Sequence, residues 1–205
     1  MVNASKARSG TDMTLAGERG PLGRRVETAA RLLAWSGGVV LLAVATVTFV
    51  SVIGRALDGV GLGAVPGDYE LVAHGCAIAV FFFLPWCQLK RGHVTVDILT
   101  DRFPPRVQAV FGLMGDLLVT LASAVILRQL WFGFGEKFPY GSDSVRQWLG
   151  MGYKPFFPET TYELQIPVWI LYGVALVGAL VMLAVGLYTT WRAACWVRDG
   201  REGAA

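Results

Sequence analysis

The chain has 205 residues, 54% of them hydrophobic, and its net charge at pH 7 is only +3. So small a charge argues against a nucleic-acid partner. Four long apolar stretches take up most of the length, and the remaining segments are too short for a separate soluble domain of ordinary size. With a mean hydropathy of +0.51, the composition predicts an integral membrane protein.

The N-terminal stretch, residues 1–23, is rich in Gly, Ser, Ala and Thr with mixed charge, which is typical of a flexible segment. We expect a flexible cytoplasmic N-terminus there, a membrane domain over residues 24–198, and a cytoplasmic tail over residues 199–205. The polar stretch before the first apolar run is longer than the charged region of a usual signal peptide. We therefore interpret the first span as a retained anchor.

The four apolar stretches cover about residues 35–53, 71–89, 107–130 and 167–190. A hydrocarbon core is about 30 Å thick, and a helix that rises 1.5 Å per residue needs about 20 residues to cross it. Because water is absent there, each stretch must satisfy its own backbone hydrogen bonds as a helix. The sequence therefore predicts an all-α fold with four transmembrane helices.

Lysine and arginine residues are distributed unevenly between the predicted sides of the membrane. Six precede the first span, four lie between the second and third spans, and three follow the fourth, whereas the first loop has only Arg55. Cytoplasmic loops carry the excess of Lys and Arg. Both termini are therefore predicted to be cytoplasmic.

The two longer connections differ in pattern. In residues 94–103, the apolar side chains of Val96, Leu99 and Phe103 fall on one helical face, which predicts a short amphipathic helix in the cytoplasmic interface. Residues 134–166 contain several prolines and are predicted to form an ordered outer loop with little regular structure.

Few residues in the spans are suited to chemistry. A haem needs two histidines at similar depth, but His74 lies near the outer side and His93 in an inner loop. No cysteine pair or nucleophile with a neighbouring base is recognisable. We expect no catalytic, cofactor-binding or metal-binding residue in this chain.

Three polar residues are candidates for contacts between helices or with a partner. Asp116 lies within the third span, where a carboxylate is costly. A helix–helix hydrogen bond or an interfacial position is one interpretation, and a proton- or cation-coupling role is another. Arg55 and Glu70 lie at the outer ends of adjacent spans, where a pair between them is one interpretation and an orienting role or a contact with another protein is another. Gly37-Gly38, and Gly173 with Gly178, would permit close helix packing.

Two motifs occur in order along the chain. Glu70 opens an apolar span, and the span is followed by Pro85-Trp86 and by Lys90-Arg91-Gly92-His93-Val94-Thr95-Val96-Asp97. The start of the last span reads Leu164-Gln165-Ile166-Pro167-Val168-Trp169, followed by Tyr172 and Gly178. Over about residues 25–195 this pattern resembles the small membrane subunit of tripartite ATP-independent periplasmic (TRAP) transporters, the DctQ-like family.

The resemblance implies a non-catalytic subunit, without a cofactor of its own, in a bacterial or archaeal inner membrane. Its partners would be a large DctM-like permease, which holds the sodium and substrate sites, and a periplasmic DctP-like binding protein. The small subunit would brace the permease and help dock the binding protein during sodium-coupled symport of an organic acid such as a dicarboxylate.

The motif residues Glu70, Arg91, His93 and Asp97 are then expected to serve structure and assembly. Arg91 and His93 can donate hydrogen bonds to lipid phosphates or to carbonyls at a helix end, and Asp97 can pair with Arg91 or cap the amphipathic helix. A positive-inside anchor without specific bonds is the alternative. Further partner contacts are expected at Arg55, Asp116, Pro167 and Trp169.

Two other functions remain open from the residues alone. The chain can be read as the membrane-anchor subunit of a redox or other enzyme complex. It can also be read as an autonomous four-helix channel or transporter, although its spans have few polar residues.

Overall fold

The computed structural model describes residues 21–90 and 104–199. In these residues the regular structure is helical, apart from an isolated bridge between Thr160 and Pro167. The elements are α2 (Pro21–Ala56), η1 (Asp58–Val60), α3 (Asp68–Leu89), α5 (Pro105–Lys137), α6 (Asp143–Trp148) and α7 (Val168–Asp199). Helices α2, α3, α5 and α7 are long and apolar enough to cross a membrane. The predicted all-α fold with four spans is confirmed.

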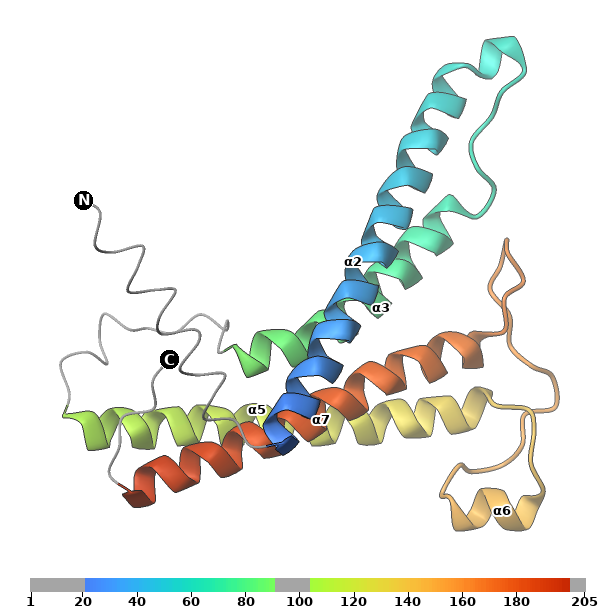
Figure 1. The fold of residues 1–205 in the computed structure, drawn as a ribbon. Helices are drawn as coiled ribbons and strands as arrows, with labels where there is room; N and C mark the ends of the chain where they lie inside the picture. The colour runs from blue at the N-terminus through green and yellow to red at the C-terminus, as the bar shows by residue number, and fades with distance from the viewer. Residues whose placement is uncertain (1–20, 91–103, 200–205) are drawn as a thin grey trace, which may run out of the picture.

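The four long helices form two hairpins. Helix α2 packs along α3, α5 packs along α7, and α3 and α7 make the principal contact between the hairpins. Figure 1 shows the two hairpins close together near the start of α2 and diverging toward η1. The arrangement is therefore two helix pairs that share one contact line, and the outer faces of α2 and α5 remain without a helical neighbour in the described chain.

Glycines allow the helices to approach closely at two crossings. A Cβ added at Gly178 of α7 would lie 2.7 Å from the carbonyl oxygen of Phe81 in α3, so no larger residue fits without a shift. A Cβ at Gly37 of α2 would lie 3.1 Å from Cβ of Phe82. Nothing lies within 4 Å of a Cβ at Gly38. The close packing expected from glycines is thus found at Gly37 and Gly178 but not at Gly38.

The best buried apolar cluster lies where the hairpins meet, at the end of α3 and the beginning of α2. Ala30, Leu89 and Val185 are its buried centre, and Val26, Trp86, Val181 and Tyr188 pack around them. Helix α2 begins at Pro21, within the stretch expected to be flexible, and its 36 residues exceed what a bilayer requires. Its first turns therefore pack on α3 and α7 before the apolar span begins.

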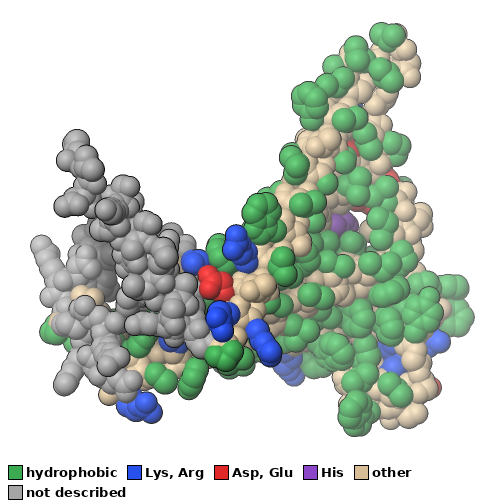
Figure 2. Space-filling view, in the orientation of Figure 1, with side chains coloured by type: hydrophobic (Ala, Val, Ile, Leu, Met, Phe, Trp, Pro, Cys, Tyr) green, Lys and Arg blue, Asp and Glu red, His purple; other side chains and the backbone are tan. Residues whose placement is uncertain are grey.

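Most of the apolar surface of the spans is exposed in the isolated chain. Figure 2 shows hydrophobic side chains along both hairpins. Large exposed residues line α2 (Val39, Leu42, Phe49, Val52) and α5 (Met114, Leu117, Leu118, Leu121). An apolar outer surface is what lipid or a membrane-embedded partner covers.

The outer loop has more regular structure than expected. Helix α5 continues to Lys137, and the loop contains the six-residue helix α6. The expectation of little regular structure over residues 134–166 was therefore wrong for these parts. The expected amphipathic helix over residues 94–103, with Arg91, His93 and Asp97, lies outside the described residues.

Candidate functional site

Two glutamates join the N-terminal turn of α3 to the segment that precedes α7. The Glu70 carboxylate accepts the backbone N–H of Glu163 at 2.8 Å and that of Leu164 at 3.1 Å. In return, the Glu163 carboxylate accepts the backbone N–H of Gly67, the residue before α3. Hydrogen bonds to an ionised acceptor are stronger than those between neutral groups. The exchange holds the outer ends of the two hairpins together.

Arg55 pairs with a carboxylate other than that of Glu70. Its guanidinium pairs with the Asp68 carboxylate, which also accepts the Ser51 hydroxyl. The Ser51 oxygen in turn accepts the backbone N–H of Val65 at 3.3 Å. An Arg55–Glu70 pair, one interpretation of the sequence, is not formed, because these bonds hold Asp68 against the end of α2, while Glu70 is occupied by the segment before α7.

A buried arginine organises the outer loop, and the sequence reasoning did not single it out. Arg146 of α6 is 1% exposed. Its guanidinium donates to the carbonyls of Gly135 and Phe138, each at 2.6 Å, and of Tyr153 at 3.0 Å. Longer bonds reach Gly152 (3.2 Å), Tyr140 (3.2 Å) and Met151 (3.3 Å). One side chain therefore fixes the end of α5, the start of the loop and the turn after α6.

Pro167 and Trp169 lie at the same outer end. Pro167 forms the isolated bridge with Thr160, and Trp169 packs edge-on against Phe138 and Tyr140, at ring-centroid distances of 5.3 and 6.1 Å. Edge-to-face rings at such distances attract one another beyond their burial. The contacts that the structure gives Trp169 are thus within the chain and hold α7 against the end of α5.

A second polar cluster lies inside the bundle, near the inner end of α3. The Gln88 amide, 2% exposed, donates to the Asp116 carboxylate at 2.9 Å and to the Thr189 hydroxyl at 3.2 Å. Thr120 bonds to the Asp116 carbonyl and to Thr190. Three helices are therefore linked by hydrogen bonds. The helix–helix bond expected as one role of Asp116 is present, and Gln88 is the partner that sequence reasoning missed.

The inner end of α3 holds a cation between two helices. The Lys90 ammonium lies 3.4 Å from the Glu27 carboxylate of α2 and 5.0 Å from the centroid of the Trp86 ring. Both contacts are partly exposed, so each contributes little to stability. They place the residue just before Arg91 beside the N-terminal part of α2.

The described residues offer little for redox or metal chemistry. No group of three His, Cys, Asp and Glu is close enough there to hold a metal. The ring of His74 bonds to the Glu70 carbonyl at 2.7 Å. It borders an apolar cavity of about 250 Å³ between α2, α3 and the outer loop. The described residues therefore form fixed helix ends rather than a cluster of converging reactive groups.

A comparison with protein families agrees with this arrangement. The family model described as "Tripartite ATP-independent periplasmic transporters, DctQ component" matches residues 44–195, which is well over half of the chain and runs from the second half of α2 into the last turns of α7. No curated protein and no solved structure gives a significant match. The chain is thus a multi-pass membrane protein that belongs to the DctQ family, the DctQ component of tripartite ATP-independent periplasmic transporters.

Proposed function

We propose that this subunit is non-catalytic, braces a large DctM-like permease in a bacterial or archaeal inner membrane, and helps to dock a periplasmic DctP-like binding protein. The transport itself is then sodium-coupled symport of an organic acid, with the sodium and substrate sites in the permease. The family match over residues 44–195 carries this proposal.

The outer end of the chain supports a docking role because it is rigidly built. The Glu70–Glu163 exchange connects the two hairpins, and Arg146 binds six carbonyls of the outer loop. A surface that must receive a soluble partner repeatedly benefits from such preorganisation, since less order is lost on binding.

The exposed faces of α2 and α5 support a bracing role. Each is apolar over several turns and lacks a helical neighbour within the described chain. In a membrane such faces meet lipid or another protein's helices, and small residues and shape decide which. We assign part of this surface to the permease.

The motif of residues 90–97, at and after the inner end of α3, completes the proposal. Lys90 contacts Glu27 of α2, and Trp86 packs on the buried cluster that includes Ala30 of α2. We assign to Arg91, His93 and Asp97 the role of fixing the chain that follows, by bonds to lipid phosphate or to helix-end carbonyls. Loss of complex assembly in Arg91→Ala or Asp97→Ala, with unchanged ligand affinity of the binding protein, is the expected result.

Co-purification and reconstitution test the function. The tagged chain, extracted in mild detergent, should bring down a large multi-span permease. Permease with this chain should take up substrate in the presence of sodium and binding protein, whereas the chain alone should move no solute. Co-purification of a soluble oxidoreductase, or a haem spectrum, would instead support an enzyme-anchor subunit. Solute transport by the isolated chain would contradict the bracing role.

A further inference from the structure

We propose that α6 and the residue after it, 143–149, are an interfacial anchor that rests in the phospholipid headgroup layer at the outer end of α5, with Val145 and Trp148 against lipid. The inference depends on the membrane spans and not on which partners the subunit has.

The position of α6 along α5 sets its depth. From Val107 to Leu127 is about 31 Å along a helix, which matches a hydrocarbon core of about 30 Å. Arg128, the next residue, is exposed and therefore marks the outer limit of the hydrocarbon. Trp131, one turn further out, donates its indole N–H to the Leu149 carbonyl at 2.9 Å. The C-terminal end of α6 therefore lies level with the headgroups.

A second contact confirms that the loop folds back along α5 rather than away from it. A Cβ on Gly135 would lie 2.8 Å from both Cα and the carbonyl oxygen of Met151, so the chain after α6 touches the α5 backbone. Figure 1 likewise shows α6 beside the end of α5. The depth assigned from Trp131 and Leu149 thus applies to the whole turn after α6.

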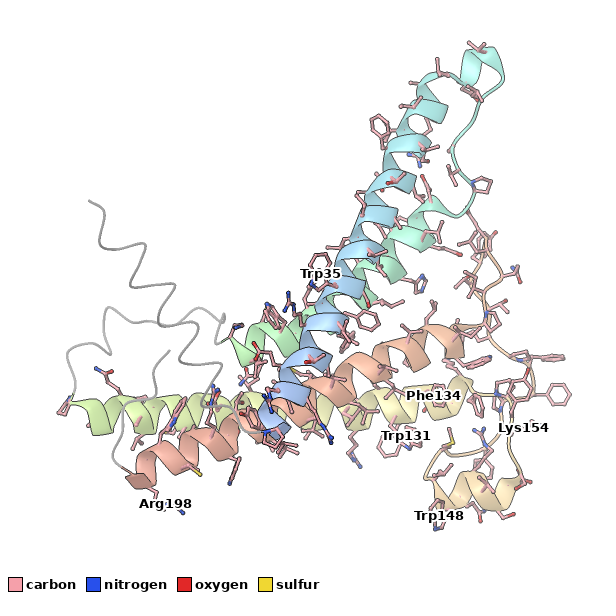
Figure 3. The ribbon with its side chains drawn as sticks, in the orientation of Figure 1. Trp35, Trp131, Phe134, Trp148, Lys154 and Arg198 are labelled. Atoms are coloured by element: carbon pink, nitrogen blue, oxygen red, sulfur yellow. The ribbon has the colours of Figure 1, made fainter. Side chains whose placement is uncertain are left out.

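The two faces of α6 differ in the way that an interfacial helix requires. Val145 and Trp148, three residues apart and so on one face, are 50% and 85% exposed. Arg146, on another face, is buried. Figure 3 shows Trp148 on the side of α6 that faces away from α5. Tryptophan is enriched at this depth because its ring is apolar and its N–H is polar.

Arg146 makes such a position tolerable for irregular backbone. Unpaired carbonyls are costly wherever water is scarce, which confines loops to places where their polar groups are satisfied. The guanidinium of Arg146 donates to six carbonyls of the chain around α6. These carbonyls therefore need no water, and the segment can rest against the membrane.

The neighbouring residues match a lipid surface better than a soluble partner. Tyr153 is 97% exposed, and the exposed Lys154 beside it offers an ammonium group to lipid phosphate. The turn between Thr160 and Pro167, which carries the exposed Tyr162, is a separate part of the outer loop that is tied to the start of α3. Trp148 lies on the side of α6 that faces away from α5, which is the side that we assign to lipid.

Site-directed spin labelling of the full chain in phosphatidylcholine–phosphatidylglycerol liposomes tests the proposal. A nitroxide at Trp148→Cys, in a background with Cys76, Cys87 and Cys195 replaced by alanine, is exposed to oxygen and to a water-soluble nickel chelate. Tyr162→Cys (Tyr162 is 90% exposed, in the outer turn) and Leu118→Cys (Leu118 is 64% exposed, mid-span) are matched controls. The oxygen-to-nickel collision ratio at position 148 should lie between the two controls.

Any other collision ratio at position 148 would contradict the proposal that α6 is an interfacial anchor. A ratio equal to that at position 162 would place Trp148 in water. A label shielded from both reagents would mean that protein covers this face. Val145→Cys provides a second position on the same face, and it should report the same depth as position 148, so that disturbance by one substitution does not decide the outcome.

Discussion

Glu70 and Glu163 each use a carboxylate to hold the other's segment: Glu70 accepts the Glu163 backbone N–H at 2.8 Å, and Glu163 accepts the N–H of Gly67. The two residues lie 93 positions apart, on the two hairpins. The α2–α3 and α5–α7 hairpins diverge toward their outer ends, so this exchange closes the fold at the end where the helices themselves pack least.

Glu70→Gln should loosen the segment before α7 without unfolding the spans. A neutral amide offers only one acceptor oxygen and no charge, so one of the two amides that Glu70 binds loses its partner. Backbone hydrogen exchange at residues 163–164 should become faster, while exchange in α5 stays unchanged. Glu136→Gln, an exposed carboxylate at the end of α5, is the control and should leave these amides protected. Equal protection of these amides in Glu70→Gln and in the parent would show that the Glu70 carboxylate does not order the segment before α7.

Arg146→Met should release the outer loop. Removal of the guanidinium leaves several carbonyls unpaired, and each unsatisfied buried group costs about 1–3 kcal/mol. We expect a lower melting temperature and rapid proteolysis within residues 138–157. Gln147→Ala changes an exposed neighbour on the same short helix and should have little effect. Arg146→Lys should resemble Arg146→Met, because an ammonium lacks the planar fork that reaches carbonyls on both sides; full stability of the lysine variant would contradict this account.

The outline of the fold could be predicted from sequence, but its outer end could not. Apolar runs of bilayer length leave the backbone only the helix, so four spans followed from composition. Arg146 was missed because its partners are backbone carbonyls, which have no signature in the sequence. The one available signal was that it is the single arginine of residues 134–166, a loop with several glycines and prolines.

The partners of the polar residues could be predicted only in part, because pairing depends on how the connecting segments fold. A pair of Arg55 with Glu70 was one interpretation of the sequence, yet Asp68 is the partner of Arg55. Which of the two nearby carboxylates pairs with Arg55 depends on the fold of the loop between α2 and α3, where Val65 and Asp68 both bond to Ser51 of α2. Asp116 was recognised as exceptional because an acidic residue in a span stands out. Gln88 was not recognised, because a glutamine at the end of a span does not stand out.

The Gln88–Asp116 pair should show strong non-additivity. Asp116→Leu leaves the Gln88 amide with one acceptor fewer in a buried site, at a cost of about 1–3 kcal/mol, and Gln88→Leu similarly removes a donor from Asp116. The double variant removes both groups and should be more stable than the sum of the single losses predicts. Thermal unfolding of the four proteins in one detergent measures this coupling. Strictly additive losses would show that the hydrogen bond contributes nothing.

Gly178→Ala should separate the two hairpins, whereas Gly38→Ala should be harmless. A methyl group at position 178 would meet the Phe81 carbonyl at 2.7 Å, so α3 and α7 must shift apart. Overpacking of this kind costs about 1–3 kcal/mol. At position 38 nothing lies within 4 Å, and alanine also favours the helix. Melting temperature and co-purification of the permease should fall in the first variant only. Equal behaviour of the two variants would mean that the α3–α7 crossing is not the contact that unites the fold.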